Sequence, residues 1–291
     1  MKFSLILCTV RRGREIAGFI ESLLRTGYKN YELIIVDQNK DDRVLKVIEM
    51  YQGEIPSLKY LKVDFVGLSR ARNVGLETIS GDSDVVAFPD DDCEYPEDIF
   101  EKVAEKFREN PDIDFLTGLL VEKSTLREVG KWKRKNTRIK IHNVFKTGVS
   151  STIFVKAHVI KSGLRFDERF GIGANTPYGS GEETDLVLKM LKMGYNGYFF
   201  RDIHVYHPYK EGDLERYEYY SAGMGAVLKR HFSWDIVYLF MCLNLLLIRP
   251  LGGITLSLLR GDINSVKKYM RILRGRWYGF LSYDERKVNE K

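Results

Sequence analysis

The sequence has few cysteines and lacks the glycine-rich signatures of the common nucleotide-binding folds. Its 291 residues include three cysteines, Cys8, Cys93 and Cys242, whose spacing matches no zinc motif. Scattered cysteines in odd number favour a reducing, cytosolic compartment. The sequence contains no GxGxxG and no GxxxxGK[ST]. Neither a dinucleotide-binding fold nor a P-loop is therefore indicated.

Clear targeting and membrane-spanning segments are also missing. Met1-Lys2 leads directly into the strand-like run FSLILC, which is too short and wrongly flanked for a signal peptide. The longest apolar stretch, residues 236 to 259, is interrupted by Arg249 and Pro250. We expect this stretch to form shorter helices in a membrane interface rather than one spanning helix.

Positive charge is concentrated in the tail. The whole chain has a net charge of +6, and residues 229 to 276 alone contain nine Lys and Arg against two acids. Around the end of this part, residues 266 to 281 have one apolar and one basic helical face. The apolar face comprises Val266, Met270, Leu273, Trp277 and Leu281, and the basic face Lys267, Lys268, Arg271 and Arg274. This pattern is typical of a helix on an anionic membrane surface. The competing interpretation is a packed helical subdomain or a homodimer interface.

A second basic stretch lies at residues 122 to 140, around Trp132. It is interpreted either as a loop that binds a phosphate-bearing or lipid-linked acceptor, or as a solvated loop. The basic stretches contain too few aromatic residues for a stacking platform, so we expect no nucleic acid partner.

The first hundred residues alternate between strand and helix patterns. Strands are predicted at residues 3 to 8, 32 to 37, 58 to 63 and 85 to 88, with amphipathic helices between them. This alternation predicts an α/β fold with a mostly parallel central sheet and helices on both faces. Ligands of such sheets bind beyond the carboxyl ends of the strands.

Polar loops follow each predicted strand, at residues 9 to 12, 37 to 39, 67 to 73 and 90 to 92. The last loop is Asp90-Asp91-Asp92, in which like charges repel unless a cation neutralises them. Asp90 and Asp92 can aim at one point, where a divalent ion carrying substrate phosphates is the usual occupant. The alternative is a solvated acidic turn that caps the next helix.

Together these motifs resemble the family 2 glycosyltransferases, which have a GT-A fold. The matching motifs are CTVRR at 8 to 12, LIIVDQN at 33 to 39, GLSRARN at 67 to 73, FPDDDCEYP at 88 to 96, GSGEETDLVLKM at 179 to 190 and HVYHP at 204 to 208. The resemblance implies a nucleotide-sugar-binding half at 1 to 96 and an acceptor-binding, catalytic half at 97 to 210. Residues 211 to 291 would form a helical, basic, membrane-associated extension.

The resemblance also implies donor-binding residues. Thr9 and Asp37 would border the nucleobase and ribose, with Gln38 near the base. The family often has Asp where Gln38 stands, so the identity of the nucleotide stays open. Arg72 would orient the acidic turn or the diphosphate.

Metal and catalytic residues are implied in the same way. Asp90 would contact the ribose or support the metal, and Asp92 would bind Mn²⁺ or Mg²⁺ directly. His207 would complete the metal shell, with His204 as the alternative ligand. Glu183 stands where the family has its general base, usually Asp; the structural alternative is an acid that favours a helix N-terminus.

The activity implied is inverting transfer of a sugar from a nucleoside-diphosphate donor to a growing, lipid-linked glycan. The glycan would be of the bacterial capsule, exopolysaccharide or O-antigen type, made at the inner face of the cell membrane. Two alternatives stay open: a sugar nucleotidyltransferase, which would release pyrophosphate, and a catalytically silent membrane-associated scaffold.

Overall fold

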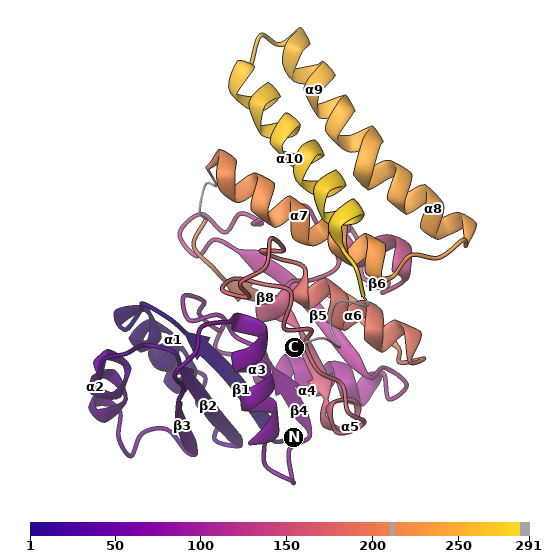
Figure 1. Ribbon diagram of the computed structural model, residues 1–291. Coiled ribbons are helices and arrows are strands. Elements are labelled where there is room, and N and C mark those ends of the chain that lie inside the picture. Colours follow the sequence, from indigo (N-terminus) through magenta and orange to yellow (C-terminus); the bar gives the residue numbers. More distant parts are fainter. Residues whose placement is uncertain (210–212, 286–291) are drawn as a thin grey trace. The chain divides into compact units, whose positions relative to one another are not determined.

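The computed structural model describes residues 1–209 and 213–285 (Figure 1). The chain divides into two compact units. The first unit comprises residues 1–166 and 186–209. The second comprises residues 167–185 and the described chain from residue 213 onward. The sequence did not predict that residues 167–185 group with the tail helices.

The first unit is built on an eight-stranded sheet in the order β3-β2-β1-β4-β7-β5-β8-β6. Strands β3, β2, β1 and β4 are parallel, β7 runs antiparallel to β4 and β5, β5 and β8 are parallel, and β6 is antiparallel to β8. The predicted mostly parallel α/β sheet is therefore confirmed. The strands are β1 (Phe3–Thr9), β2 (Tyr31–Asp37), β3 (Leu58–Lys62), β4 (Val85–Ala87), β5 (Phe115–Val121), β6 (Thr137–Arg138), β7 (Phe154–Lys156) and β8 (Gly197–Tyr206).

Helices cover both faces of the sheet because alternate strand residues point to opposite sides. Leu5 and Leu7 of β1 join Phe19 and Phe100 in the main apolar core, whereas Ile6 meets the opposite helix, α3. These helices and the short turns are α1 (Arg14–Arg25), α2 (Arg43–Met50), α3 (Leu68–Glu77), α4 (Ile99–Glu109), α5 (Ala157–Lys161) and the 3₁₀ turns Ile141–Lys146 and Ser150–Thr152. Helix α6 (Glu182–Lys192) begins at the end of segment 167–185, which belongs to the second unit, and its remaining residues belong to the first unit.

Helices form the second unit. They are α7 (Leu214–Arg230), α8 (Ile236–Leu243), α9 (Arg249–Leu259) and α10 (Ile263–Ser282). A π-helical segment, Asn244–Ile248, joins α8 to α9, so residues 236–259 form one continuous helix. The prediction of shorter, separate helices is wrong. The wider π turn precedes Pro250, which has no N–H to donate, and Arg276 Nη1 donates to the Leu245 carbonyl oxygen instead.

Helix α10 packs on α7 (Figure 1), and glycines of α10 lie in this contact. A Cβ atom on Gly279 would stand 1.9 Å from the carbonyl oxygen of Ala222, so the two backbones are in close contact. Two large apolar residues of α10 stay at the surface, since Met270 is 56% exposed and Leu281 is 72% exposed. Helix α10 therefore packs in a helical subdomain while its predicted amphipathic face stays open.

Within the described residues, one helix is long and apolar enough to cross a membrane. It is Ile236–Leu259, and 28% of its most apolar stretch is buried. Phe240 and Leu259 are among its exposed side chains.

Candidate active site

The acidic turn is held by backbone pairing at the carboxyl ends of three strands. Asp90 forms a parallel bridge with Cys8 of β1. Beyond the turn, Glu94 and Tyr206 exchange two backbone hydrogen bonds of 2.9 Å. The end of β8 is thereby tied to the chain that leaves β4, and this places His207 beside the aspartates.

Asp91 is the most buried of the three aspartates. Thr9 Oγ1 donates a 2.7 Å hydrogen bond to Asp91 Oδ2, and Arg12 Nη1 donates to Asp91 Oδ1. Burial raises the pKa of the Asp91 carboxyl to about 6, although the Thr9 hydroxyl and the Arg12 charge oppose this shift. Asp91 thus fastens the turn to the end of β1. The sequence assigned no role to Asp91 or Arg12.

Asp92 and His207 form a close pair. His207 Nε2 lies 3.2 Å from Asp92 Oδ1, and Nδ1 lies 2.9 Å from the carbonyl oxygen of Pro208. Burial by itself lowers the pKa of His207, but the hydrogen bond and charge of Asp92 outweigh it and raise that pKa. His204 instead packs beside Tyr206, with ring centroids 5.2 Å apart. The structure therefore brings His207, not His204, to the acidic turn.

The pair fits a divalent ion completed by phosphate. His207 Nε2 would have to lose its proton to bind an ion, which would then replace the hydrogen bond to Asp92. No cluster of three or more His, Cys, Asp or Glu side chains suited to a metal occurs within residues 1–209 and 213–285. Mg²⁺ and Mn²⁺ accept few protein ligands when a diphosphate and water supply the others. Asp92 and His207 would then hold the ion.

Asp90 faces a buried arginine. Arg72 Nη2 lies 3.2 Å from Asp90 Oδ1, and Ser150 Oγ donates to the same oxygen at 3.4 Å. Arg72 is only 1% exposed, and its guanidinium lies 5.3 Å from the centroid of the Phe166 ring. Arg72 thus contacts the acidic turn, as one of its predicted roles requires.

Asp37 and Gln38 both hold the loops that surround the expected donor site. The buried Asp37 carboxylate accepts hydrogen bonds from Asn39, Tyr60 Oη at 2.8 Å and Lys62 Nζ at 2.9 Å. Gln38 Oε1 accepts a 2.7 Å hydrogen bond from the backbone N–H of Gly67. The amide of Gln38 therefore ties the loop after β2 to the start of α3. Their contacts with a nucleotide remain predictions.

The loop after β1 contains a strained residue that sequence reasoning missed. Arg11 has a φ of +61°, which is uncommon for a residue with a side chain. Its backbone N–H donates to Asn39 Oδ1 at 2.5 Å. Strain of this kind is retained where neighbouring contacts impose it, often near binding sites.

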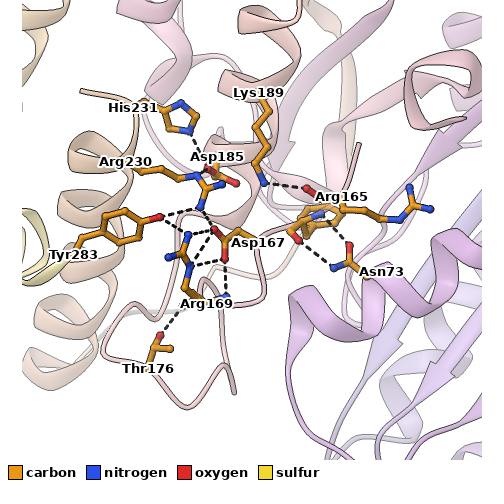
Figure 2. Close-up of polar contacts among 11 residues, drawn as sticks. Asn73, Arg165, Asp167, Arg169, Thr176, Asp185, Lys189, Arg230, His231 and Tyr283 are labelled. Atoms are coloured by element: carbon orange, nitrogen blue, oxygen red, sulfur yellow. Dashed lines mark hydrogen bonds and ion pairs between the residues drawn. The ribbon is translucent and has the colours of Figure 1, made fainter. Parts of the chain in front are cut away.

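In the second unit, Glu183 lies half-buried in the first turn of α6. Two residues later, the fully buried Asp185 lies 2.9 Å from Arg230 Nε and 2.8 Å from His231 Nε2 (Figure 2). Arg230 also pairs with Asp167, so one guanidinium joins both ends of the segment 167–185 (Figure 2). Asp185 is an ion-paired anchor for the helix start that carries Glu183. Arg230 and His231 were not predicted, because His231 is 46 positions away from Asp185.

The basic stretch at 122–140 folds back on the first unit. Trp132 stacks on Phe199, with ring centroids 6.3 Å apart, and its Nε1 donates a 3.0 Å hydrogen bond to the carbonyl oxygen of Val129. Arg201 donates to the carbonyl oxygen of Lys133 at 2.6 Å. These contacts use the indole in packing, so the ring is not a free stacking surface.

The first unit is thus an α/β fold with a mostly parallel sheet, and its acidic and polar loops lie at the carboxyl edge, where such folds bind ligands. The chain belongs to glycosyl transferase family 2, whose family model matches residues 4–161. The predicted resemblance to this family is thereby confirmed.

Sequence relatives match parts of the chain. An uncharacterized glycosyltransferase of Haemophilus influenzae is 34% identical over 113 residues, which are 39% of this chain and 37% of that protein. The minor teichoic acid biosynthesis protein GgaA of Bacillus subtilis is 28% identical over 180 residues, covering 57% of this chain and 40% of GgaA. The matches thus span about two fifths of each relative.

Solved structures show the fold. The mannosyltransferase PcManGT of Pyrobaculum calidifontis, in complex with GDP-Man and Mn²⁺, has a TM-score of 0.70 at 12% identity, covering 97% of this chain and 88% of that one. The structure of residues 1–349 of S. aureus TarS has a TM-score of 0.60 at 18% identity, covering 92% of this chain and 90% of that one. The GT-A fold predicted from the motifs is confirmed.

Proposed function

We propose that this protein is a metal-dependent, inverting glycosyltransferase that extends a lipid-linked glycan of the bacterial cell surface. The position of His207 beside Asp92 at the carboxyl edge of the sheet carries the proposal, because a carboxylate and a neutral imidazole can both bind a divalent ion. Two solved relatives in complex with GDP-Man and Mn²⁺ and with UDP-GlcNAc support a nucleotide-sugar donor.

The metal, Mn²⁺ or Mg²⁺, would neutralise charge on the departing diphosphate. Glu183 would accept the proton of the acceptor hydroxyl as that oxygen bonds to the anomeric carbon and the bond to the diphosphate breaks. A single displacement of this kind inverts the anomeric configuration. The buried contacts of Asp185 with Arg230 and His231 would hold the helix start that positions Glu183.

We further propose that the protein works on the inner face of the cell membrane. Its second unit combines an exposed apolar helix, 236–259, with the cations of α10. The relationship to GgaA supports a cell-surface polymer as the product. The lipid-linked acceptor and the peripheral location rest on these observations.

The test combines donor binding with turnover. Calorimetry with UDP, GDP, dTDP and CDP sugars and Mn²⁺ should identify a donor for the wild-type protein. Asp92→Ala should abolish the metal dependence of binding, whereas Asp112→Ala, an exposed aspartate before β5, should leave it unchanged. Glu183→Gln should bind the donor normally and lose turnover by on the order of 10²–10⁴-fold.

Several outcomes would contradict the proposal. Full metal-dependent binding by Asp92→Ala would remove Asp92 from the metal site. Normal turnover by Glu183→Gln would place the base elsewhere. Release of pyrophosphate with formation of a sugar nucleotide would instead identify a nucleotidyltransferase.

A further inference from the structure

The second unit contains an apolar groove beside α10. The groove has a volume of about 700 Å³, and its apolar lining consists of Leu214, Met270, Leu273 and Trp277. Met270 is 56% exposed and Leu214 is 37% exposed. The face of α10 that packs on α7 is formed by glycines, so these large apolar side chains remain available to a ligand.

Cations converge on the same groove. Lys267, Arg271 and Arg274 line it together with the apolar side chains. Glu218 is the carboxylate that pairs with both arginines, at 2.5 Å from Arg271 Nη1 and 3.1 Å from Arg274 Nε. Glu215 lines an adjoining hollow as well, so two carboxylates face the three cations and an excess of one positive charge remains. Pairing with Glu218 also holds the two guanidiniums in place.

A second hollow shares the two arginines. Its volume is about 460 Å³, and Pro177, Tyr219 and Tyr278 contribute to its lining along with Arg271 and Arg274. The arginines therefore lie between an apolar groove and a hollow with aromatic walls. Aromatic rings with a hydroxyl combine an apolar face with a polar edge, which suits a sugar.

The second hollow adjoins the segment that leads to Glu183. A Cβ atom on Gly179 would stand 2.0 Å from the Tyr219 ring, so this backbone lies directly against the wall of the hollow. Gly179 is followed by Ser180, whose hydroxyl donates to the carbonyl oxygen of Tyr220 at 2.8 Å. Within the second unit, the apolar groove is thus next to the two arginines, and the arginines are next to the aromatic hollow. The hollow in turn adjoins the backbone just before α6.

We propose that this groove binds the lipid phosphate of the acceptor. The hydrocarbon chain would lie on Met270, Leu273 and Trp277, the phosphate would contact Arg271 and Arg274, and the first sugar would enter the hollow beside Tyr219. Glu218 holds the Arg271 and Arg274 guanidiniums close together, and a phosphate monoester or diphosphate offers them more anionic oxygens than a diester headgroup does. The inference rests on the proposed lipid-linked acceptor and names the residues that recognise it.

The experiment compares two kinds of vesicle. Phosphatidylcholine vesicles contain either a polyprenyl phosphate or phosphatidylglycerol, adjusted to the same surface charge. The wild-type protein should bind the polyprenyl phosphate vesicles on the order of tenfold more tightly or better. The variant R271Q/R274Q should lose this preference. Met270→Ser, at an exposed position, should weaken this preference as well, because it removes an apolar side chain from the groove and adds no charge beside the arginines.

The matched control is R249Q/R260Q, which removes two cations from exposed positions of the same unit. It should weaken binding to both vesicles alike and keep the preference. The proposal would be overturned if wild-type protein bound the two vesicles equally, or if R271Q/R274Q and R249Q/R260Q had equal effects. Either result would indicate nonspecific attraction to an anionic membrane. Displacement by inorganic phosphate would show a free-phosphate site instead.

Donor binding is measured on the same proteins. If every protein binds a nucleotide sugar with Mn²⁺ but none prefers the polyprenyl phosphate, only the lipid site is wrong. If none binds a nucleotide sugar, the proposed function itself fails.

Discussion

Asp90, Asp91 and Asp92 are adjacent in sequence but meet different partners. Asp90 lies against Arg72, Asp91 is buried between Thr9 and Arg12, and Asp92 reaches both Arg12 and His207. Repulsion within the run is offset because each carboxylate has its own donor. An acidic run of this kind thereby becomes an ordered site.

A second buried carboxylate allows a prediction on stability. Glu32 of β2 is fully buried and is contacted by Lys59 Nζ at 2.7 Å, Ser4 Oγ at 2.5 Å and Ser80 N at 2.7 Å. Burial alone raises the pKa of Glu32, but hydrogen bonds from Lys59, Ser4 and Ser80 lower it from 4.5 to about 2. Glu32 therefore stabilises the fold above pH 4.5, and this contribution is lost as the pH falls towards 2.

Glu32→Gln should lower the free energy of unfolding at pH 7 by about 2–3 kcal/mol. Urea unfolding should also show a flatter pH dependence below pH 4.5 than in the wild-type protein. The control Asp82→Asn removes an exposed pair with Lys2 and should have almost no effect. If the free energy of unfolding changed with pH in the same way for wild type and Glu32→Gln, the result would contradict the role of Glu32.

At the level of elements, glycines decide how α10 is used. Their absence of side chains lets α10 approach α7 closely, and this leaves the larger side chains of α10 for the groove. The amphipathic pattern in the sequence marked those apolar side chains correctly. It did not indicate which face would pack, because the packed face is not an apolar stripe.

Gly279→Ala should therefore disturb the second unit. The added methyl group would overlap backbone at Ala222, and we expect a loss of about 1–3 kcal/mol in the free energy of unfolding. Gly252→Ala is the matched control, since a Cβ at this α9 position meets nothing within 4 Å. It should stabilise the helix by about 0.5–1 kcal/mol. Thermal unfolding followed by circular dichroism measures both; equal melting temperatures would contradict the close contact.

At the level of the whole molecule, the two units differ in surface chemistry. The first unit encloses its apolar residues in the sheet core, whereas the second exposes an apolar helix next to cations. An apolar surface of this kind is costly in water and suits a membrane interface.

We predict that the protein floats with vesicles of phosphatidylcholine and phosphatidylglycerol. The variant F240D/L259D should bind at least about tenfold more weakly, since each side chain contributes about 1.5–3 kcal/mol when buried in the bilayer. Met50→Asp, at a 71% exposed position in the first unit, is the control and should bind like wild type. Unchanged flotation of F240D/L259D would contradict membrane contact through this helix.

Local patterns predicted the strands, the parallel sheet and the loops at its carboxyl edge. They did so because side-chain period and turn residues act over a few positions. They failed at Pro250, where the helix continues. A hydrogen bond from Arg276 to Leu245, which no local pattern shows, compensates for the missing N–H of the proline.

The sequence by itself determined the α/β fold, the family and the residue types present at the candidate site. Only the tertiary structure decided their partners: His207 rather than His204 beside Asp92, Arg72 on Asp90, and Asp185 held by Arg230 and His231. The physical reason is the separation along the chain over which each interaction acts. Propensity and periodicity act between neighbours in the chain, whereas ion pairs and burial depend on packing between residues far apart in sequence.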